Sequence, residues 1–291
     1  MINILLSILS SMLLAISFKV LDNLKLNAFQ AIVANYYVAA TMGFITSTAN
    51  IPVIELPKQP WFIIAFMLGF VFILILNIIS VTTQKLGITV AGVANKMSIV
   101  IPVGVAVILY GDNLNAIKVF GLILALIAVF LTSQKDSKSA PEQLVDKKLY
   151  IFPLLIFFGS GLIDSSINYA QRYYLDDNTF TLFLSVIFGT AGIIGTLTFL
   201  YNLAIDKLRI QLASLFAGVL IGFVNYFSMY FVIRCLNEKI FSPSVFFPVN
   251  NMGILAISTF AAFLIFKEKL SKTNWIGIVL ALFSIFIIAF A

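Results

Sequence analysis

The sequence predicts an all-α integral membrane protein in which ten transmembrane helices form two inverted five-helix repeats. Its 291 residues are 61% hydrophobic and only 10% charged, and the mean hydropathy is +1.08. A soluble domain is roughly 45–50% apolar and about 25% charged, and so few polar residues could not cover an apolar surface of this size. The composition therefore excludes a water-soluble enzyme, a DNA-binding domain and a disulfide-rich scaffold.

The residue types that the chain lacks exclude further kinds of site. The sequence contains no histidine and one cysteine, Cys235, which cannot form an internal disulfide. Histidine-based catalytic triads and His/Cys metal clusters are therefore impossible, and no G-x-x-x-x-G-K-[ST] segment offers a Walker A site. We expect no metal and no cofactor. The formal charge of +6 requires no nucleic acid, because lysines in cytoplasmic loops supply such an excess.

Ten apolar runs, each close to the length of about 20 residues that a spanning helix needs, are separated by polar or turn-forming breaks. Barrel strands would be shorter and would alternate in polarity. The first run has no basic segment before Lys19 and no A-x-A-like cleavage site, so we expect a membrane helix there rather than a signal peptide. The expected spans are 2–18, 28–48, 61–83, 88–109, 114–133, 149–171, 179–201, 211–233, 241–266 and 273–290.

A polar stretch divides the chain into a first repeat at 1–133, a loop at 134–148 and a second repeat at 149–291. Residues of the two parts match in the same order, with offsets that drift as loop insertions would make them drift. The matches are Leu24, Asn27 and Phe29 with Leu175, Asn178 and Phe180 (offset 151), Asn77 and Ser80 with Asn225 and Ser228 (offset 148), and Asn95, Gly121 and Ala125 with Asn251, Gly277 and Ala281 (offset 156). Because each copy has an odd number of spans, the second must enter the membrane upside down, as in secondary transporters with a midplane site between their repeats.

The ends of the two halves carry similar segments, Y-G-D-N-L-N-A-I-K-V-F-G-L-I-L-A-L at 110–126 and F-K-E-K-L-S-K-T-N-W-I-G-I-V-L-A-L at 266–282. An apolar helix, a linker with an acidic residue and leucine, and a glycine-containing helix resemble the ten-helix EamA family of the drug/metabolite transporter superfamily. That family usually has Gly-Glu in the linker, whereas this chain has Gly-Asp and Lys-Glu. With the helix count and the duplication, the resemblance covers the whole chain and implies transport of small organic solutes, often export.

Two further features favour structural roles. Asp112 and Glu268 precede helices, where a carboxylate interacts well with the positive end of the helix dipole. We expect both to cap helices, with direct contact to cargo as the alternative. The pair Gly218-x-x-x-Gly222 predicts close packing of its helix against a neighbour.

The distribution of basic residues predicts the orientation in the membrane. Loops that follow odd-numbered runs contain most of the lysines and arginines, for example Lys25, Lys147 and Arg209. The positive-inside rule then places the central loop in the cytoplasm and both termini outside. Many relatives in the family that the chain resembles have the reverse arrangement. We expect a multi-pass protein of the cell membrane, the cytoplasmic membrane of a bacterium.

Two formal charges, Lys96 and Asp164, fall well inside the fourth and sixth runs. A charge at the centre of the membrane costs at least ~2.5–3.5 kcal/mol on insertion scales, so such residues normally face a protein interior or a watery cavity. Helical rise separates the two by about 10 Å along the membrane normal, which makes a direct pair awkward. We expect contact with cargo, with mutual pairing and snorkelling of Lys96 as alternatives.

Amides and hydroxyls accompany these charges. Asp164, Asn168 and Gln171 share one helix face, and Pro102 and Pro248 are expected to interrupt the fourth and ninth spans beside asparagines. Amides also join helices inside membranes, so a packing role is the alternative for each of them. The expected substrate-binding residues are Asn77, Ser80, Asn95, Lys96, Asp164, Asn168, Asn225, Ser228, Asn250 and Asn251.

The expected function is secondary active transport of small polar or amphipathic metabolites by alternating access. Export is the direction that the resemblance implies. Amino acids are a candidate cargo, because Lys96 and Asp164 suit the two ends of a zwitterion. The expected partners are a small-molecule substrate, membrane lipids and protons as a coupling ion, with the chain as a monomer or homodimer. The alternative is a membrane scaffold or a lipid-moving subunit. An intramembrane enzyme is least favoured, because Asp164 has no second carboxylate beside it in the sequence.

Overall fold

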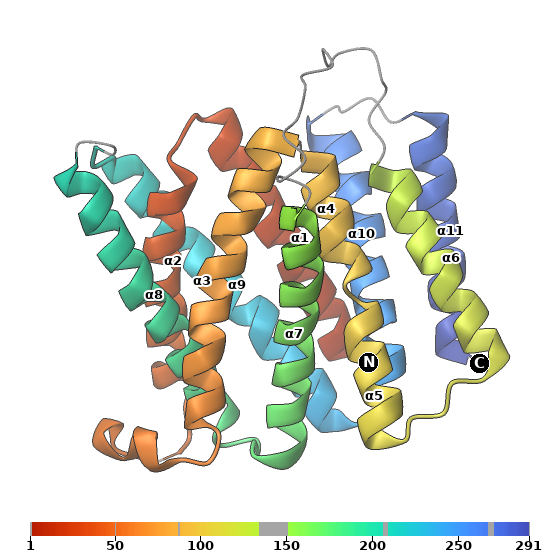
Figure 1. Ribbon diagram of the computed structural model, residues 1–291, viewed down its shortest axis with the longest axis horizontal. Coiled ribbons are helices and arrows are strands. Elements are labelled where there is room, and N and C mark those ends of the chain that lie inside the picture. The colour runs from red at the N-terminus through yellow and green to blue at the C-terminus, as the bar shows by residue number, and fades with distance from the viewer. Residues whose placement is uncertain are drawn as a thin grey trace. The chain divides into compact units, whose positions relative to one another are not determined.

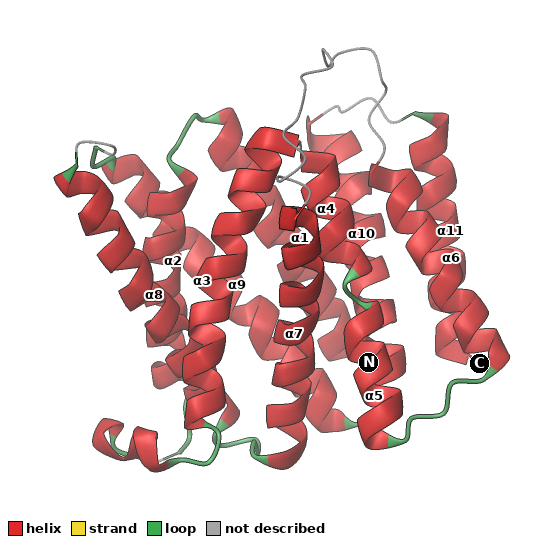
Figure 2. Cartoon of the chain, viewed as in Figure 1, coloured by secondary structure: helices red, strands yellow, loops and turns green. Residues whose placement is uncertain are grey.

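The computed structural model describes residues 2–49, 51–86, 88–133, 151–205, 209–266 and 271–290. Within these ranges the chain forms helices, loops and turns and contains no strand (Figure 2). The prediction of an all-α protein is thus confirmed for this part of the chain. The helices of Figure 1 are α1 (Ile2–Asn23), α2 (Ala28–Ile45), the 3-10 helix η1 (Val53–Lys58), α3 (Phe62–Leu86), α4 (Ile88–Met97), α5 (Val100–Tyr110), α6 (Ala116–Ser133), α7 (Ile151–Tyr173), α8 (Phe180–Ala204), α9 (Leu212–Glu238), α10 (Pro243–Phe266) and α11 (Lys272–Phe290).

Most of these helices are long and apolar enough to cross a membrane. Eight candidate spans meet that criterion in the described part of the chain, and α4 and α5 together form one of them, Val90–Tyr110. Two further helices, α6 and α11, contain the shorter apolar runs Ala116–Leu131 and Lys272–Ile288. Helices of this length and composition are those of a multi-pass membrane protein.

The fourth expected span consists of two helices instead of one. α4 ends at Met97 and α5 begins at Val100, and Figure 2 shows the break between them as a short loop. Pro102 has no N–H to donate to the carbonyl of Ser98 one turn earlier. That carbonyl accepts instead from the backbone N–H of Ile101 at 2.9 Å. The interruption predicted from Pro102 is therefore confirmed.

The ninth span remains one helix, so the expectation that Pro248 breaks it is wrong. α10 begins at Pro243, where a missing N–H is harmless because the first helical N–H groups have no partner within the helix. The helix then runs through Pro248. The carbonyl that Pro248 leaves without a helical donor belongs to Ser244 in the first turn, and the loss of one bond so close to the helix end is tolerated.

The helices divide into two units, each held together by its own contacts. The first unit comprises Met1–Ile73 and Ser166–Ile240, and the second comprises Leu74–Ser165 and Phe241–Ala291. Each unit combines helices from both expected repeats. The repeats are therefore not separate packing units, and α3 and α7 contribute to both units.

In the first unit α9 packs against α1 and α2, and α2 packs against α8. Glycines allow the close approach of α9 to α2. A Cβ atom on Gly222 would lie 2.8 Å from the carbonyl oxygen of Asn35, and one on Gly218 would lie 2.8 Å from the Cα of Ala31. Both distances are too short for a real contact, so the predicted close packing of Gly218-x-x-x-Gly222 is confirmed.

The N-terminal ends of α2 and α9 are joined by reciprocal amide hydrogen bonds. Gln30 Nε2 donates to the carbonyl of Arg209 at 2.6 Å, and the backbone N–H of Gln211 donates to Gln30 Oε1 at 2.8 Å. The backbone N–H of Asn27 donates in turn to Gln211 Oε1 at 2.9 Å. These bonds satisfy backbone groups that helix ends leave without partners and fix the two helices side by side.

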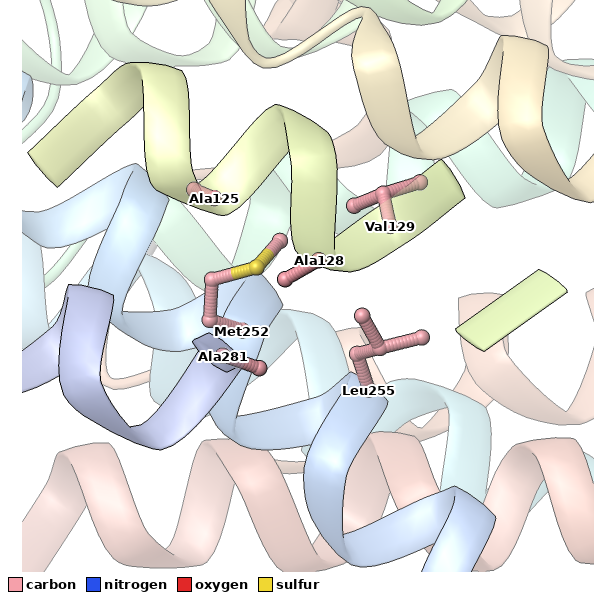
Figure 3. Packing of buried hydrophobic residues seen from close by; sticks show 6 residues of the cluster. All are labelled: Ala125, Ala128, Val129, Met252, Leu255 and Ala281. Atoms are coloured by element: carbon pink, nitrogen blue, oxygen red, sulfur yellow. The ribbon is translucent and has the colours of Figure 1, made fainter. Parts of the chain in front are cut away.

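In the second unit α6 packs against α11, and α10 contacts α5, α6 and α11. The core between α6, α10 and α11 is built largely from small side chains, as Figure 3 shows. Alanines at the contact let the helix backbones approach closely. The buried residues of this cluster are Ala125, Ala128, Val129, Met252, Leu255 and Ala281.

Asp112 caps a helix, as predicted, but not the helix that follows it in sequence. Its Oδ2 accepts a hydrogen bond of 3.2 Å from the backbone N–H of Ser244 in the first turn of α10. α6 begins instead after Asn115, whose Oδ1 accepts from the backbone N–H of Lys118 at 2.8 Å. The carboxylate thus lies at the positive end of α10. Glu268 lies outside the described residues.

Candidate functional site

The candidate site residues lie on five elements and in both units. The second unit contains Asn77 on α3, Asn95 and Lys96 on α4, Asp164 on α7, and Asn250 and Asn251 on α10. The first unit contains Asn168 on α7, and Asn225 and Ser228 on α9. Ser80 belongs to α3, but its side chain lies outside the described part of the structure.

Lys96 lies in the last turn of α4, directly before the break. A helix leaves its last carbonyl groups without helical partners and carries a partial negative charge at this end. The carbonyl of Asn95 accepts a hydrogen bond of 2.6 Å from the hydroxyl of Ser98, which lies in the break. Lys96 therefore belongs to the negatively polarised end of a half-helix inside a candidate span.

Three candidate residues of the second unit form one cluster around this ammonium. Lys96 Nζ donates to Asn251 Oδ1 at 3.5 Å, and Lys96 and Asp164 interact electrostatically. Asn251 Nδ2 donates to the carbonyl of Phe247 at 3.2 Å. This second bond orients the amide so that its oxygen faces Lys96. The cluster, which we call the Lys96 cluster, consists of Lys96, Asp164 and Asn251.

The Lys96 cluster brings together groups that the sequence separates. Each of the three side chains is partly buried and belongs to a candidate span, where little water is available. A cation and an anion that compensate each other cost far less there than either charge alone. The electrostatic interaction supports the alternative of mutual compensation that the sequence left open, and it leaves contact with cargo open as well. Among the described residues, no group of three or more His, Cys, Asp or Glu side chains could hold a metal ion.

Asn225 and Ser228 of the first unit are engaged in hydrogen bonds between helices. Asn225 Nδ2 donates to Asn35 Oδ1 on α2 at 3.0 Å, and the hydroxyls of Ser228 and Ser11 on α1 are 2.7 Å apart. Side-chain bonds of this kind hold helices together inside membranes. A role in packing therefore has direct support for both residues, whereas their role in substrate binding remains a prediction.

Asn168 is the candidate whose polar atoms stand out. The side chain is 1% exposed, and neither its Nδ2 nor its Oδ1 has a hydrogen-bond partner in the described structure. A buried polar group without a partner costs about 1–3 kcal/mol. Asp164 and Gln171 lie on the same face of α7, and Gln171 Nε2 donates to Asn237 Oδ1 at 2.8 Å. Water or a polar group of a substrate at Asn168 would remove that cost.

Sequence analysis did not identify two polar residues that contact the candidates. Asn35 and Ser11 bind Asn225 and Ser228. Asn35 in the middle of an apolar run was the available signal. Single uncharged polar residues are common in membrane helices, so this signal points to no particular partner.

Comparisons with known proteins show the fold and no activity. The chain matches no known family model. It is 25% identical over 292 residues to an uncharacterized protein of Haemophilus influenzae, and the match covers 98% of this chain and 96% of that protein. It also superposes on a solved crystal structure with a TM-score of 0.74 at 11% identity, over 98% of this chain and 94% of the other. The helical fold is thus shared with a protein of almost unrelated sequence.

Proposed function

We propose that the protein is a secondary active transporter of small polar or amphipathic metabolites, amino acids among them, which works by alternating access in the bacterial cytoplasmic membrane. Export is the proposed direction. The observation that carries this proposal is the Lys96 cluster. Lys96, beside a break inside a candidate span, is hydrogen-bonded to Asn251 on α10 and interacts electrostatically with Asp164 on α7. Polar groups beside interrupted helices are the usual composition of a transporter's substrate and ion site.

In the first unit, contacts between α2 and α8 agree with a two-fold relation, which supports the proposal of two inverted repeats. Gly43 on α2 contacts Ser185 on α8, and Gly192 on α8 contacts Tyr36 on α2. A shift of 149 residues converts Gly43 to Gly192 and Tyr36 to Ser185. The same shift therefore exchanges the two contacts, as a two-fold axis between repeats requires. The value falls between the offsets of 151 and 148 that relate the neighbouring segments.

The second unit supports the same relation. Ala125 on α6 and Ala281 on α11, which correspond at an offset of 156, are both fully buried in the core of Figure 3. Corresponding helices are also in contact, since α6 packs against α11 and α5 packs against α10. Inverted repeats of this kind are typical of secondary transporters and of the EamA-type proteins that the sequence resembles.

Flux through the purified protein tests the proposal. Reconstituted in proteoliposomes, the wild type should exchange at least one compound from a panel of amino acids and other small metabolites. In Lys96→Met and Asp164→Asn, the loss of a charge-assisted hydrogen bond of about 1.5–3 kcal/mol should lower kcat/KM roughly tenfold to a hundredfold. The matched control is Lys118→Met at the start of α6, which removes a lysine outside the cluster and should transport normally.

Two outcomes would contradict the proposal. If folded Lys96→Met and Asp164→Asn both transport like the wild type, the Lys96 cluster is structural and the cargo binds elsewhere. If the wild type moves no soluble compound of the panel, a scaffold or lipid-moving role is favoured, and transfer of labelled lipid between leaflets of the same vesicles would separate those two roles.

A further inference from the structure

The 3-10 helix η1 presents the most exposed large apolar side chain of the described residues. Ile54 is 85% exposed, and its neighbour Val53 is 68% exposed. Both belong to the loop between two candidate spans, Ala28–Ile45 and Phe62–Ile79. Adjacent apolar side chains that a protein exposes at such a place mark an interaction surface. The function proposed above makes no use of these two residues.

η1 holds this exposed pair in a defined position. The backbone N–H of Glu55 donates to the carbonyl of Pro52 at 2.9 Å, and that of Gln59 donates to the carbonyl of Leu56 at 3.0 Å. The Leu56 side chain is only 3% exposed. η1 is therefore a hydrogen-bonded element that one buried leucine attaches to the protein, and its exposed residues do not belong to a structureless loop.

Two contacts place the ends of this loop at the level where α8 begins. The hydroxyl of Thr48 donates to Asn178 Oδ1 at 2.9 Å, directly before α8. The ring of Trp61, which is buried, has its centroid 6.1 Å from that of Phe183 in the first turn of α8. Because α8 is a candidate span, its first turn marks one boundary of the apolar layer. Figure 1 shows η1, the short orange helix, at this end of α2 and α3 and lying across their direction.

Exposed apolar side chains of the neighbouring spans lead up to η1. Ile45 in the last turn of α2 is 71% exposed, and Ile63 in the first turn of α3 is 57% exposed. On a helix that crosses a membrane, such side chains contact lipid. The exposed pair of η1 continues this series along the chain. Glu55 and Lys58 of η1 are exposed as well, and a mixture of apolar and charged side chains is typical of helices that lie in the membrane interface.

We propose that η1 is an interfacial anchor, in which Val53 and Ile54 insert among the lipid headgroups of the bilayer that surrounds the first unit. Its partner is the lipid surface. Insertion removes two apolar side chains from water, while Leu56 and Trp61 attach the anchor to the protein. An anchor of this kind fixes the depth at which α2 and α3 cross the membrane. It acts whether or not the protein transports a solute.

Spin labels on single cysteines test this inference in protein reconstituted into liposomes, in a Cys235→Ala background. Oxygen concentrates in the bilayer and a nickel chelate remains in water, so the ratio of the two accessibilities reports depth. The label on Ile54→Cys should have a several-fold higher oxygen-to-nickel ratio than the label on Lys239→Cys, an exposed position directly after α9. The label on Leu197→Cys, which is 62% exposed on α8, provides the reference for contact with lipid.

Photochemical labelling provides a second measurement that keeps an apolar side chain on η1. With an apolar diazirine amino acid in place of Ile54, illumination in liposomes should attach phospholipid to the protein, which mass spectrometry of the surrounding peptide detects. The same amino acid in place of Leu56 is the matched control. Because Leu56 is buried, its replacement should form links within the protein and should attach little lipid.

The inference and the proposed function fail in different ways. An oxygen-to-nickel ratio at Ile54 equal to that at Lys239 would overturn the anchor, because η1 would then face water, even in a protein that transports metabolites. A label shielded from both reagents, with diazirine links to a second copy of the chain, would overturn it too and would make η1 a contact between copies. A high ratio with attached phospholipid would establish the anchor, even in a protein that moves no solute.

Discussion

Asp176 organises the turn between α7 and α8 through a single carboxylate oxygen. Its Oδ1 accepts from the Thr179 hydroxyl at 2.7 Å, from the Thr179 N–H at 2.8 Å and from the Asn178 N–H at 3.0 Å. The Thr179 hydroxyl and these backbone N–H groups hold the pKa of Asp176 below its usual value, against the opposing effect of partial burial. The three bonds favour the charged carboxylate.

The turn makes a testable contribution to stability that depends on pH. Because folding lowers the pKa of Asp176, its stabilisation is fully present above the pKa of the unfolded chain and is lost as the pH falls through the folded-state pKa. We expect Thr179→Val to lower stability by a few tenths of a kcal/mol at neutral pH, since the site is exposed. Tm measured over an acidic pH series should show the difference from the wild type shrinking. A difference that grows towards low pH would contradict this account.

At the residue scale, the sequence marks charged residues inside spans clearly, but it does not reveal the hydrogen-bond partners of amides. Lys96 and Asp164 stand out because an ionisable group inside an apolar run is costly and therefore rare. The repeat also marked Asn225 and Ser228, yet it could not reveal that their bonds go to Asn35 and Ser11. A hydrogen-bond partner on another helix depends on how helices are rotated against each other, and one sequence does not encode that rotation in any local pattern.

Among the elements, α9 depends on glycine at its contact with α2. A Cβ on Gly222 would lie 2.8 Å from a backbone oxygen of Asn35, which cannot move without moving α2. We expect Gly222→Ala to destabilise the protein by about 1–3 kcal/mol, the usual cost of overpacking. Tm in detergent measures this directly.

Gly104 on α5 provides the matched control, because a Cβ there would meet no atom within 4 Å. Gly104→Ala should be neutral or stabilise by roughly 0.5–1 kcal/mol, since alanine loses less backbone freedom on folding. Equal destabilisation by both substitutions would show that glycine matters at these positions for a reason other than the contact between α9 and α2.

The contact between α2 and α8 can be fixed covalently. A Cβ on Gly192 would lie 3.5 Å from the Cβ of Tyr36, within the range of about 3.5–4.5 Å that a disulfide requires. Tyr36→Cys with Gly192→Cys, in a Cys235→Ala background, should form a disulfide under mild oxidation. Its reduction should shift the mobility of a protein that has been cleaved between the two helices. Absence of the disulfide in folded protein would contradict the pairing of α2 with α8.

Helix positions were predictable where local chemistry marks them. Asn27 was the last residue before an expected span, and its side chain indeed caps α2 by accepting from the N–H of Gln30 at 3.1 Å. Pro102 marked the end of α4 for an equally local reason. Pro248 does not mark a helix end, because the effect of a proline depends on its distance from the helix start, and apolar runs do not define that start closely.

For the whole molecule, orientation is the prediction that is simplest to test. The bias of lysine and arginine places the loop at 134–148 in the cytoplasm. Cysteines introduced there, in a Cys235→Ala background, should resist an impermeant thiol reagent in intact cells and react after the cells are opened. Cysteines in the loop at 47–60 serve as the control, since that side should react in intact cells. Ready labelling of the 134–148 loop in intact cells would contradict the predicted orientation and place this loop outside the cell.

The division of the helices into two units could not be predicted from the sequence. Matching residues indicate which segments correspond, as Ala125 corresponds to Ala281, but they do not state that corresponding helices touch. In the structure each unit draws helices from both expected repeats. Such a division results from apolar and small-residue faces over the full length of each helix, and these faces are nearly alike on every apolar run of this chain.

The pairing of α9 with α1 and α2 has a consequence for how the protein is made. Ribosomes release a chain from its N-terminus, so α1 and α2 enter the bilayer long before α9 exists. Ser11, Gln30 and Asn35 must wait there without the partners Ser228, Gln211 and Asn225. During that interval lipid or the insertion machinery has to accommodate their polar groups. A chain that stalls before α9 is made therefore keeps these polar side chains without their final partners.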